Sequence, residues 1–213
     1  MIKTYAYDDV LLIPQYSDIR SRAEINISTN LGPRVELQLP IFASPMDTVS
    51  ESAMANAMRS HGGSAIVHRY NTIEEQVAEV NKVEFPRVIG AAIGVSGDYL
   101  ERASALADAG TNFLCIDVAH GHHIMMKEAL WELRLMFGDD YHLMAGNVAT
   151  LAAINDLADW GATSVRCNIG GGSICSTRIQ TGHGLPGLQT IIECAKTDRD
   201  VKIIADGGIK NSG

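Results

Sequence analysis

The chain lacks the segments that place a protein in or across a membrane. No apolar run approaches the length of a membrane span, and residues 1–9 lack the apolar stretch of a signal peptide. The chain has only four cysteines, and no two of them form a Cys-x-x-Cys pair, so the usual spacing of a metal cluster is absent. We therefore expect a cytoplasmic protein whose thiols stay reduced.

Positive charge is also in deficit. Lys and Arg total 17 against 25 Asp and Glu, which gives a net charge of −8 over 213 residues. An acidic protein is a poor candidate for binding nucleic acid or an anionic membrane, and we expect neither as a partner. A small nucleotide can still bind, because the geometry of a local loop outweighs net charge for a small ligand.

The chain alternates short apolar runs with helical patterns from residue 39 onward. Seven runs, mostly apolar throughout, are typical of parallel strands buried on both faces: 41–46, 64–69, 88–94, 113–118, 142–148, 163–169 and 201–206. Amphipathic helices are predicted between and after them, at 51–59, 73–83, 99–109, 124–137, 151–160 and 188–196. Two pairs of residues predict helix N-termini, Thr72 with Glu75 and Asp98 with Glu101. Thr150 is a further candidate N-cap.

Seven strand–helix repeats favour a TIM (β/α)₈ barrel over a Rossmann sheet, and no Gly-x-Gly-x-x-Gly follows the first strand. We predict a single barrel domain over residues 1–213, with seven of the eight strands present. The last strand and the flap after it are expected beyond Gly213. Cys115 and Cys167 lie in strand-like runs and Cys194 in a helix-like one, so all three are expected in the core.

Polar residues gather where the predicted strands end, and in a barrel those ends carry the active site. The segments concerned are 44–47, 68–69, 117–120, 146–147, 170–175 and 206–208, and they include the polar residues Ser44, Asp47, His68, Arg69, Asp117, His120, Asn147 and Asp206. Ordinary structural roles compete with this interpretation: a helix cap for Asp47, and turn or loop contacts for His68 and Asn147. The histidines of residues 120–123 are too close in sequence to face one ion together, so we expect no metal site there.

The segment 170–178, Gly-Gly-Gly-Ser-Ile-Cys-Ser-Thr-Arg, has the composition of a covalent catalytic loop. Cys175 is a candidate nucleophile, and the hydroxyls of Ser173 and Thr177 could position a substrate or carry protons. Consecutive glycines let the backbone approach a ligand closely, and their N–H groups suit a phosphate. The competing interpretation is a surface turn that contains an ordinary buried cysteine.

Five motifs, in their order along the chain, resemble the IMP dehydrogenase / GMP reductase family. They are residues 7–14 (YDDVLLIP), 44–49 (SPMDTV), 145–148 (AGNV), 172–178 (GSICSTR) and 205–209 (ADGGI). The resemblance covers essentially the whole chain. It implies a barrel enzyme that acts on C2 of the purine ring of a nucleoside monophosphate.

The resemblance also implies residue roles. Cys175 would attack C2 and Thr177 would assist proton transfer. The nucleotide would contact Ser44, Met46, Gly172, Ser173, Asp206, Gly207 and Gly208. Asp117 and Asn147 would line the nicotinamide side of an NADP or NAD cofactor. The backbone carbonyls of Gly170, Gly172 and Cys175 would help to bind a monovalent cation, with potassium as the candidate.

The family contains two reactions, and the motifs divide between them. Residues 21–24, 116–122 and 193–195 look more like GMP reductases, which convert GMP to IMP with NADPH. The runs 44–47 and 205–209 look at least as much like IMP dehydrogenases, which convert IMP to XMP with NAD. No regulatory insertion follows the second repeat, because only residues 84–87 separate the predicted second helix from the third strand. We favour the reductase.

Two further alternatives are a catalytically inactive nucleotide-binding protein and one part of a split enzyme. As partners we expect other copies in a homo-oligomer, or a complementing C-terminal fragment. The loop departs from common family patterns at Gly171, Ser176 and His183, and none of these positions carries a reacting group.

Overall fold

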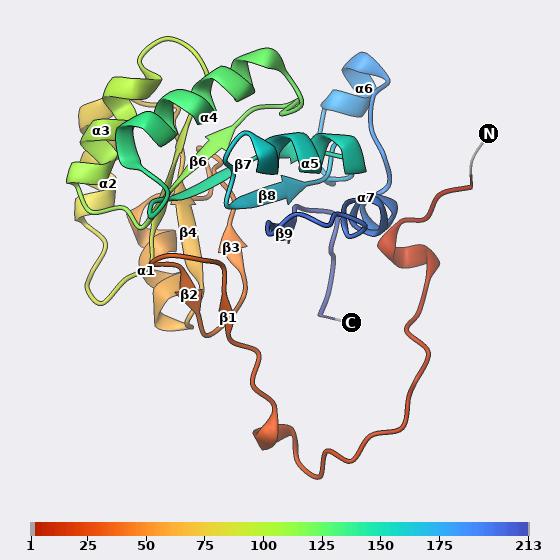
Figure 1. Cartoon of the computed structure of the whole chain (residues 1–213). Helices are drawn as coiled ribbons and strands as arrows, with labels where there is room; N and C mark the ends of the chain where they lie inside the picture. The colour runs from red at the N-terminus through yellow and green to blue at the C-terminus, as the bar shows by residue number, and fades with distance from the viewer. Residues whose placement is uncertain (1–2, 213) are drawn as a thin grey trace.

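The computed structural model describes residues 3–212, and its main feature is a curled parallel sheet of seven strands in the order β3-β4-β5-β6-β7-β8-β9 (Figure 1). The strands are β3 (Phe42–Ala43), β4 (Ser64–Val67), β5 (Gly90–Ile93), β6 (Phe113–Asp117), β7 (His142–Val148), β8 (Ser164–Cys167) and β9 (Lys202–Ala205). Each lies inside one of the predicted runs. The seven-stranded part of the barrel prediction is therefore confirmed.

Helices follow the strands and lie on the outside of the sheet (Figure 1). They are α1 (Ser52–Ser60), α2 (Ile73–Asn81), α3 (Tyr99–Asp108), α4 (Ile124–Phe137), α5 (Leu151–Asp159), α6 (Thr177–Thr181) and α7 (Gly187–Cys194). All but the short α6 were predicted from the sequence pattern. None of the helices that the structure describes is both long and apolar enough to span a membrane.

Two of the helix caps predicted from the sequence form in the structure, and two do not. Thr72 and Glu75 form the expected capping box, and the Thr150 hydroxyl accepts the N–H of Ala153 at 3.2 Å. Asp98 occupies the N-cap position of α3 but makes no cap hydrogen bond. Its carboxylate pairs instead with Arg102 at 2.8 Å, because a charge-assisted contact one turn along the helix competes for the same oxygens. Asp47 does not cap α1, whose N-cap position is Glu51.

Side chains that alternate along the strands pack into two separate hydrophobic clusters, one on each face of the sheet. On β4, Ala65 and Val67 join the large cluster under the helices, whereas Ile66 joins a smaller cluster inside the curl. On β6, Leu114 likewise faces the helices and Phe113 faces inward. Side chains at alternate positions of a strand point to opposite faces of the sheet. The inward positions nearer the carboxyl ends are therefore left to carry polar residues.

The amino-terminal end of the curl is closed by a hairpin that the sequence did not reveal. Two-residue strands β1 (Thr29–Asn30) and β2 (Glu36–Leu37) pair in antiparallel fashion. Val35 and Leu37 pack against the inner cluster, where the Phe42 and Phe113 rings meet edge to face with centroids 5.6 Å apart. The curl thus opens toward the carboxyl ends of the strands.

The described part of the N-terminal arm contacts α7 near residues 5–7. It contains two 3₁₀ turns, η1 (Tyr7–Asp9) and η2 (Arg22–Glu24). The carbonyl of Tyr5 accepts the N–H of Gln189 on α7 at 3.1 Å. Between this contact and β1 the arm arcs away from the body (Figure 1).

Candidate active site

One cavity, of about 780 Å³, opens at the carboxyl ends of the strands. Every residue that the sequence assigned a catalytic, nucleotide, cofactor or cation role lines it: Ser44, Met46, Asp117, Asn147, Gly170, Gly172, Ser173, Cys175, Thr177, Asp206, Gly207 and Gly208. The strand order brings them together, because parallel strands end at the same edge of the sheet. Their individual roles stay predictions.

A buried arginine that sequence reasoning missed forms the floor of this cavity. Arg166 is only 5% exposed, and its two terminal nitrogens contact different carboxylates. Nη1 lies 2.6 Å from Oδ1 of Asp117, and Nη2 lies 2.9 Å from Oδ1 of Asp206. Burial alone would lower the pKa of the guanidinium, but the surrounding negative groups raise it above its usual range. The centre therefore combines two carboxylates with a permanently charged cation.

Asp206 is the most heavily bonded residue of the cavity. Its Oδ2 accepts the side-chain amide of Asn147 at 2.6 Å, and the Ser44 hydroxyl lies 3.4 Å from its Oδ1. The Asn168 amide donates to its backbone carbonyl at 2.7 Å. These contacts come from segments far apart in the sequence, so Asp206 is held in one orientation by tertiary structure.

Glycine at position 146 makes room for this centre. A Cβ added to Gly146 would stand 2.7 Å from Cβ of Arg166 on the adjacent strand. Real Cβ atoms do not approach each other so closely, so a larger residue would displace the arginine. Because Gly146 on β7 has no side chain, the Arg166 side chain can lie across the floor of the cavity.

The Cys175 loop forms one wall, and its thiol is chemically activated. The N–H of Cys175 donates to the carbonyl of Gly172 at 3.1 Å, which closes the turn. The pKa of Cys175 is lowered, first by a hydrogen bond from the Thr177 side chain and then by backbone N–H groups including that of Gly170; the small burial of the thiol opposes them. Hydrogen bonds to sulfur favour the thiolate, which is the nucleophilic form.

The other three cysteines are core residues, as predicted. Cys115, Cys167 and Cys194 are all buried and unpaired by disulfides. Burial raises the pKa of Cys115 to about 12. Among the described cysteines, only Cys175 is both accessible to a ligand and activated.

Sequence reasoning also missed two further polar lining residues, Tyr70 and Asn168, whereas Arg69 belongs to one of the predicted strand ends. The Arg69 guanidinium donates to the Asp117 carbonyl at 3.3 Å and lies 5.4 Å from the centre of the Tyr70 ring. The sequence did carry one signal. Ser164, Arg166 and Asn168 are polar residues at alternate positions of the run 163–169, with Val165 and Cys167 between them, which places the three on one face of the strand.

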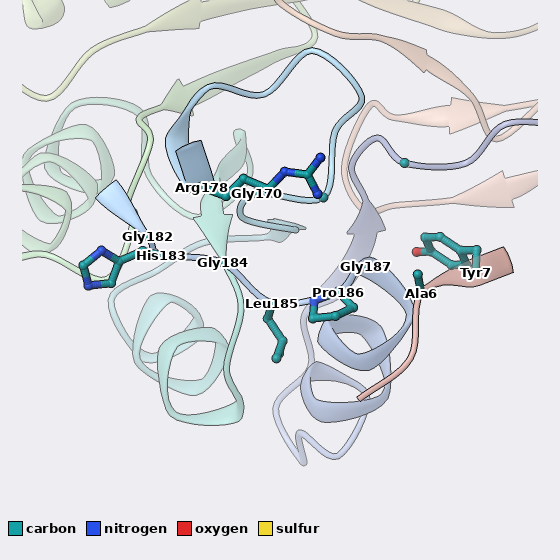
Figure 2. Close-up of a pocket in the computed structure, with 12 residues that line it drawn as sticks. Ala6, Tyr7, Gly170, Arg178, Gly182, His183, Gly184, Leu185, Pro186 and Gly187 are labelled. Carbon is teal, nitrogen blue, oxygen red and sulfur yellow. The ribbon is translucent and has the colours of Figure 1, made fainter. Parts of the chain in front are cut away.

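A second, smaller cavity of about 310 Å³ lies beside the Cys175 loop and shares Gly170 and Gly208 with the first. Figure 2 shows that Tyr7 and Arg178 approach it from different segments, the N-terminal arm and α6. Tyr7 packs against the start of α7, since a Cβ on Gly187 would stand 2.8 Å from its ring. Residues of the loop 170–178 therefore line both cavities.

The family model described as the IMP dehydrogenase / GMP reductase domain matches residues 4–213. The chain is similar to the inosine-5'-monophosphate dehydrogenase of Cryptosporidium parvum, at 34% identity over 99% of this chain and 63% of the relative. It is also similar to the GMP reductase of Mesoplasma florum, at 31% identity over 98% of this chain and 66% of the relative.

Among solved structures, the chain resembles the crystal structure of inosine 5' monophosphate dehydrogenase from Legionella pneumophila. The TM-score is 0.90 at 43% sequence identity, and the match covers 99% of this chain and 64% of that one. The chain thus spans slightly less than two thirds of the length of these three relatives.

Proposed function

The chain belongs to the IMP dehydrogenase / GMP reductase family, and on that premise we propose that its cavity supports oxidoreductase chemistry at C2 of the purine ring of a nucleoside monophosphate. One observation carries the proposal. The cysteine with a lowered pKa lines the same cavity as the bridged carboxylates Asp117 and Asp206. A covalent reaction on a nucleotide requires a nucleophile and, in the same cavity, groups that accept hydrogen bonds from the hydroxyls of the nucleotide.

Cys175 is the proposed nucleophile. With GMP as substrate, the thiolate forms a bond to C2, and the bond from C2 to the exocyclic nitrogen breaks. The departing amine needs a proton, and Thr177 is the hydroxyl beside the sulfur that can pass one on. The adduct is resolved when C2 gains a hydride and the thiolate leaves again, which restores the free enzyme.

Nucleotide binding is assigned to the residues around Asp206. A carboxylate accepts hydrogen bonds from ribose hydroxyls, and Asp206 is fixed for this by Asn147 and Arg166. The backbone of Gly208 and the hydroxyl of Ser173 are proposed to hold the phosphate. Ser44 and Met46, together with Gly172 and Gly207, would enclose the rest of the nucleotide.

A nicotinamide cofactor, NADP or NAD, supplies or accepts the hydride when it is bound. We propose that Asp117 and Asn147 line its side of the cavity. A monovalent cation, with potassium as the candidate, would be held by the carbonyls of Gly170, Gly172 and Cys175, which are suitable ligands for such an ion. The Gly172 carbonyl accepts a backbone N–H, and its second lone pair is available.

Of the two family reactions, we propose reduction of GMP to IMP with NADPH, because of the reductase-like runs 21–24, 116–122 and 193–195. The second candidate is oxidation of IMP to XMP with NAD. The 43% identity to the Legionella pneumophila dehydrogenase favours that alternative. We propose that either reaction takes place in the cytoplasm, where Cys175 stays reduced.

We further propose that an eighth strand–helix unit completes the barrel domain, either within a longer chain or as a separate fragment. Strands β3 and β9 each have one neighbour in the sheet, so both present an unpaired edge. The N-terminal arm, which arcs away from the body (Figure 1), exposes apolar side chains, with Leu11 at 94%, Leu12 at 90% and Tyr16 at 95%. We propose that these apolar side chains are covered either by that closing unit or by another copy of the chain in a homo-oligomer.

The test measures the absorbance of the reduced nicotinamide in mixtures of the protein with GMP and NADPH, and with IMP and NAD. Consumption of NADPH supports the reductase, and formation of NADH supports the dehydrogenase. A fragment supplying the closing unit is added in a parallel series. Absence of turnover in both directions, with and without that fragment, would contradict the proposed activity and leave nucleotide binding as the function to test.

A further inference from the structure

Arg166 joins residues at the ends of two strands that are not neighbours in the sheet. Asp117 is the last residue of β6, and Asp206 directly follows β9, with β7 and β8 between these strands. Arg166 lies on β8, and its two terminal nitrogens reach one carboxylate each, at 2.6 and 2.9 Å. The separation between the two carboxylates is therefore bridged by a single side chain.

We propose that Arg166 is a positioning residue, which holds Asp117 and Asp206 as a fixed pair of hydrogen-bond acceptors for two ligands in one cavity. The identity of those ligands rests on the proposed function, but the positioning of the carboxylates does not. Among the described residues, no hydrogen bond reaches Oδ2 of Asp117, and the side chains of both aspartates stay 19% exposed. They can therefore contact ligands while Arg166 stays beneath them.

The guanidinium is suited to this task by its shape. Its nitrogens are held in one plane, so the two carboxylates are fixed in direction as well as in distance. A lysine would supply the same charge from a single nitrogen. It could approach one carboxylate or lie between them, but it would not make both contacts in the same geometry.

The surroundings of Arg166 leave it little freedom. Its side chain is 7% exposed, Nη1 also lies 3.8 Å from the buried thiol of Cys115, and Gly146 has no side chain to displace it. Arg69 is the other cation that lines this cavity, and its hydrogen bond to Asp117 goes to the backbone carbonyl and not to the carboxylate. Arg166 alone among the described cations bridges the two carboxylates.

Arg102 provides a matched control for the loss of a buried arginine. It is 7% exposed, and it contacts Asp98 and Gln76 at 2.8 Å each, on the helices outside the sheet. It does not line the cavity. Arg166→Met and Arg102→Met therefore both remove a buried guanidinium from an ion pair, but only the first acts on the cavity.

The first experiment needs no ligand. The side-chain amide of Asn147, which donates to Asp206, gives a nuclear magnetic resonance signal that reports where that carboxylate is. We expect R166M to shift this signal toward its position in Asp206→Ala, and R102M to leave it unchanged. An Asn147 signal in R166M at the wild-type position would overturn the proposal.

The second experiment covers the case in which R166M does not fold, and it separates geometry from charge. Calorimetric titration with GMP and with IMP is performed on the wild type, Arg166→Lys and R102M. We expect R166K to bind about tenfold more weakly and R102M to bind as the wild type does. Equal affinity in R166K and wild type would overturn the proposal. If the wild type binds neither nucleotide, the proposed function fails, and the Asn147 signal of R166K, compared with D206A, decides the role of Arg166.

Discussion

The side-chain amide of Asn147 donates to Oδ2 of Asp206 at 2.6 Å, although 59 positions separate the two residues in the chain. The sequence assigned Asn147 to the cofactor side and Asp206 to the nucleotide side. Their direct contact means that the two proposed subsites share one hydrogen-bonded floor. A change at either residue is therefore expected to affect both ligands, and this connects the predictions that follow.

Replacement of the proposed nucleophile tests the covalent step. Cys175→Ala should abolish the covalent purine adduct while leaving the fold and nucleotide affinity essentially intact, because the half-buried thiol is not part of the core. Mass spectrometry of the protein after incubation with nucleotide and cofactor measures the adduct. The buried Cys194→Ala serves as the control and should still form it. An adduct in C175A would contradict the assignment.

Removal of the Thr177 hydroxyl tests the activation of the thiol. The pKa of Cys175 is lowered first by the hydrogen bond to Thr177, so Thr177→Val should raise that pKa and reduce the thiolate fraction at neutral pH. We expect alkylation of Cys175 by iodoacetamide at pH 7 to slow severalfold and its pH midpoint to move upward. Thr181→Val, in the same short helix, should alkylate at the wild-type rate. Identical midpoints in T177V and wild type would refute the role of this hydrogen bond.

Acid should destabilise the protein through His142, a fully buried ring at the start of β7. Burial, and to a lesser extent the charge of Arg134, lowers its pKa from 6.5 to about 4. The unfolded chain then binds the proton more readily than the folded one, so this contribution to stability is full above pH 6.5 and is lost as the pH falls toward 4. Between pH 7 and 5 we expect a loss of about 2 kcal/mol from this residue.

Urea unfolding at pH 7 and pH 5 measures this loss. His142→Asn removes the ionisable ring and should lose about 2 kcal/mol less than the wild type over that interval, although it starts from a lower stability. The exposed His183→Asn should behave as the wild type does. If H142N and wild type lose the same stability between the two pH values, the buried histidine does not account for acid sensitivity.

The close approach at Gly146 yields a prediction about packing. Gly146→Ala would place its Cβ 2.7 Å from Cβ of Arg166, so we expect a loss of about 1–3 kcal/mol in unfolding free energy and weaker nucleotide binding. Gly94→Ala is the control, because its nearest neighbour would be at an ordinary 3.6 Å. Thermal unfolding and calorimetry measure the two effects. Wild-type affinity in G146A would show that Arg166 can move without consequence.

Much of the fold could be predicted because its signals are local. An apolar run such as 142–148 identifies a buried strand, and the Thr72–Glu75 pair marks a helix start within four residues of chain. Asp98 shows the limit of such signals. Its sequence context suits a cap, but the carboxylate contacts Arg102 instead, and local pattern does not decide between two nearby donors.

The sequence predicted most of the residues that line the candidate site, but not the hydrogen bonds and ion pairs that join them. Cys175 and Asp206 follow strands, and parallel strands bring their ends together, so the sequence was enough to place both at one edge. By itself the sequence determined the order of the seven sheet strands and the main helices, the polar strand ends and the place of the Cys175 loop among them. Only the tertiary structure decided that Arg166 bridges Asp117 and Asp206, because the curl of the sheet sets which inward side chains meet across strands.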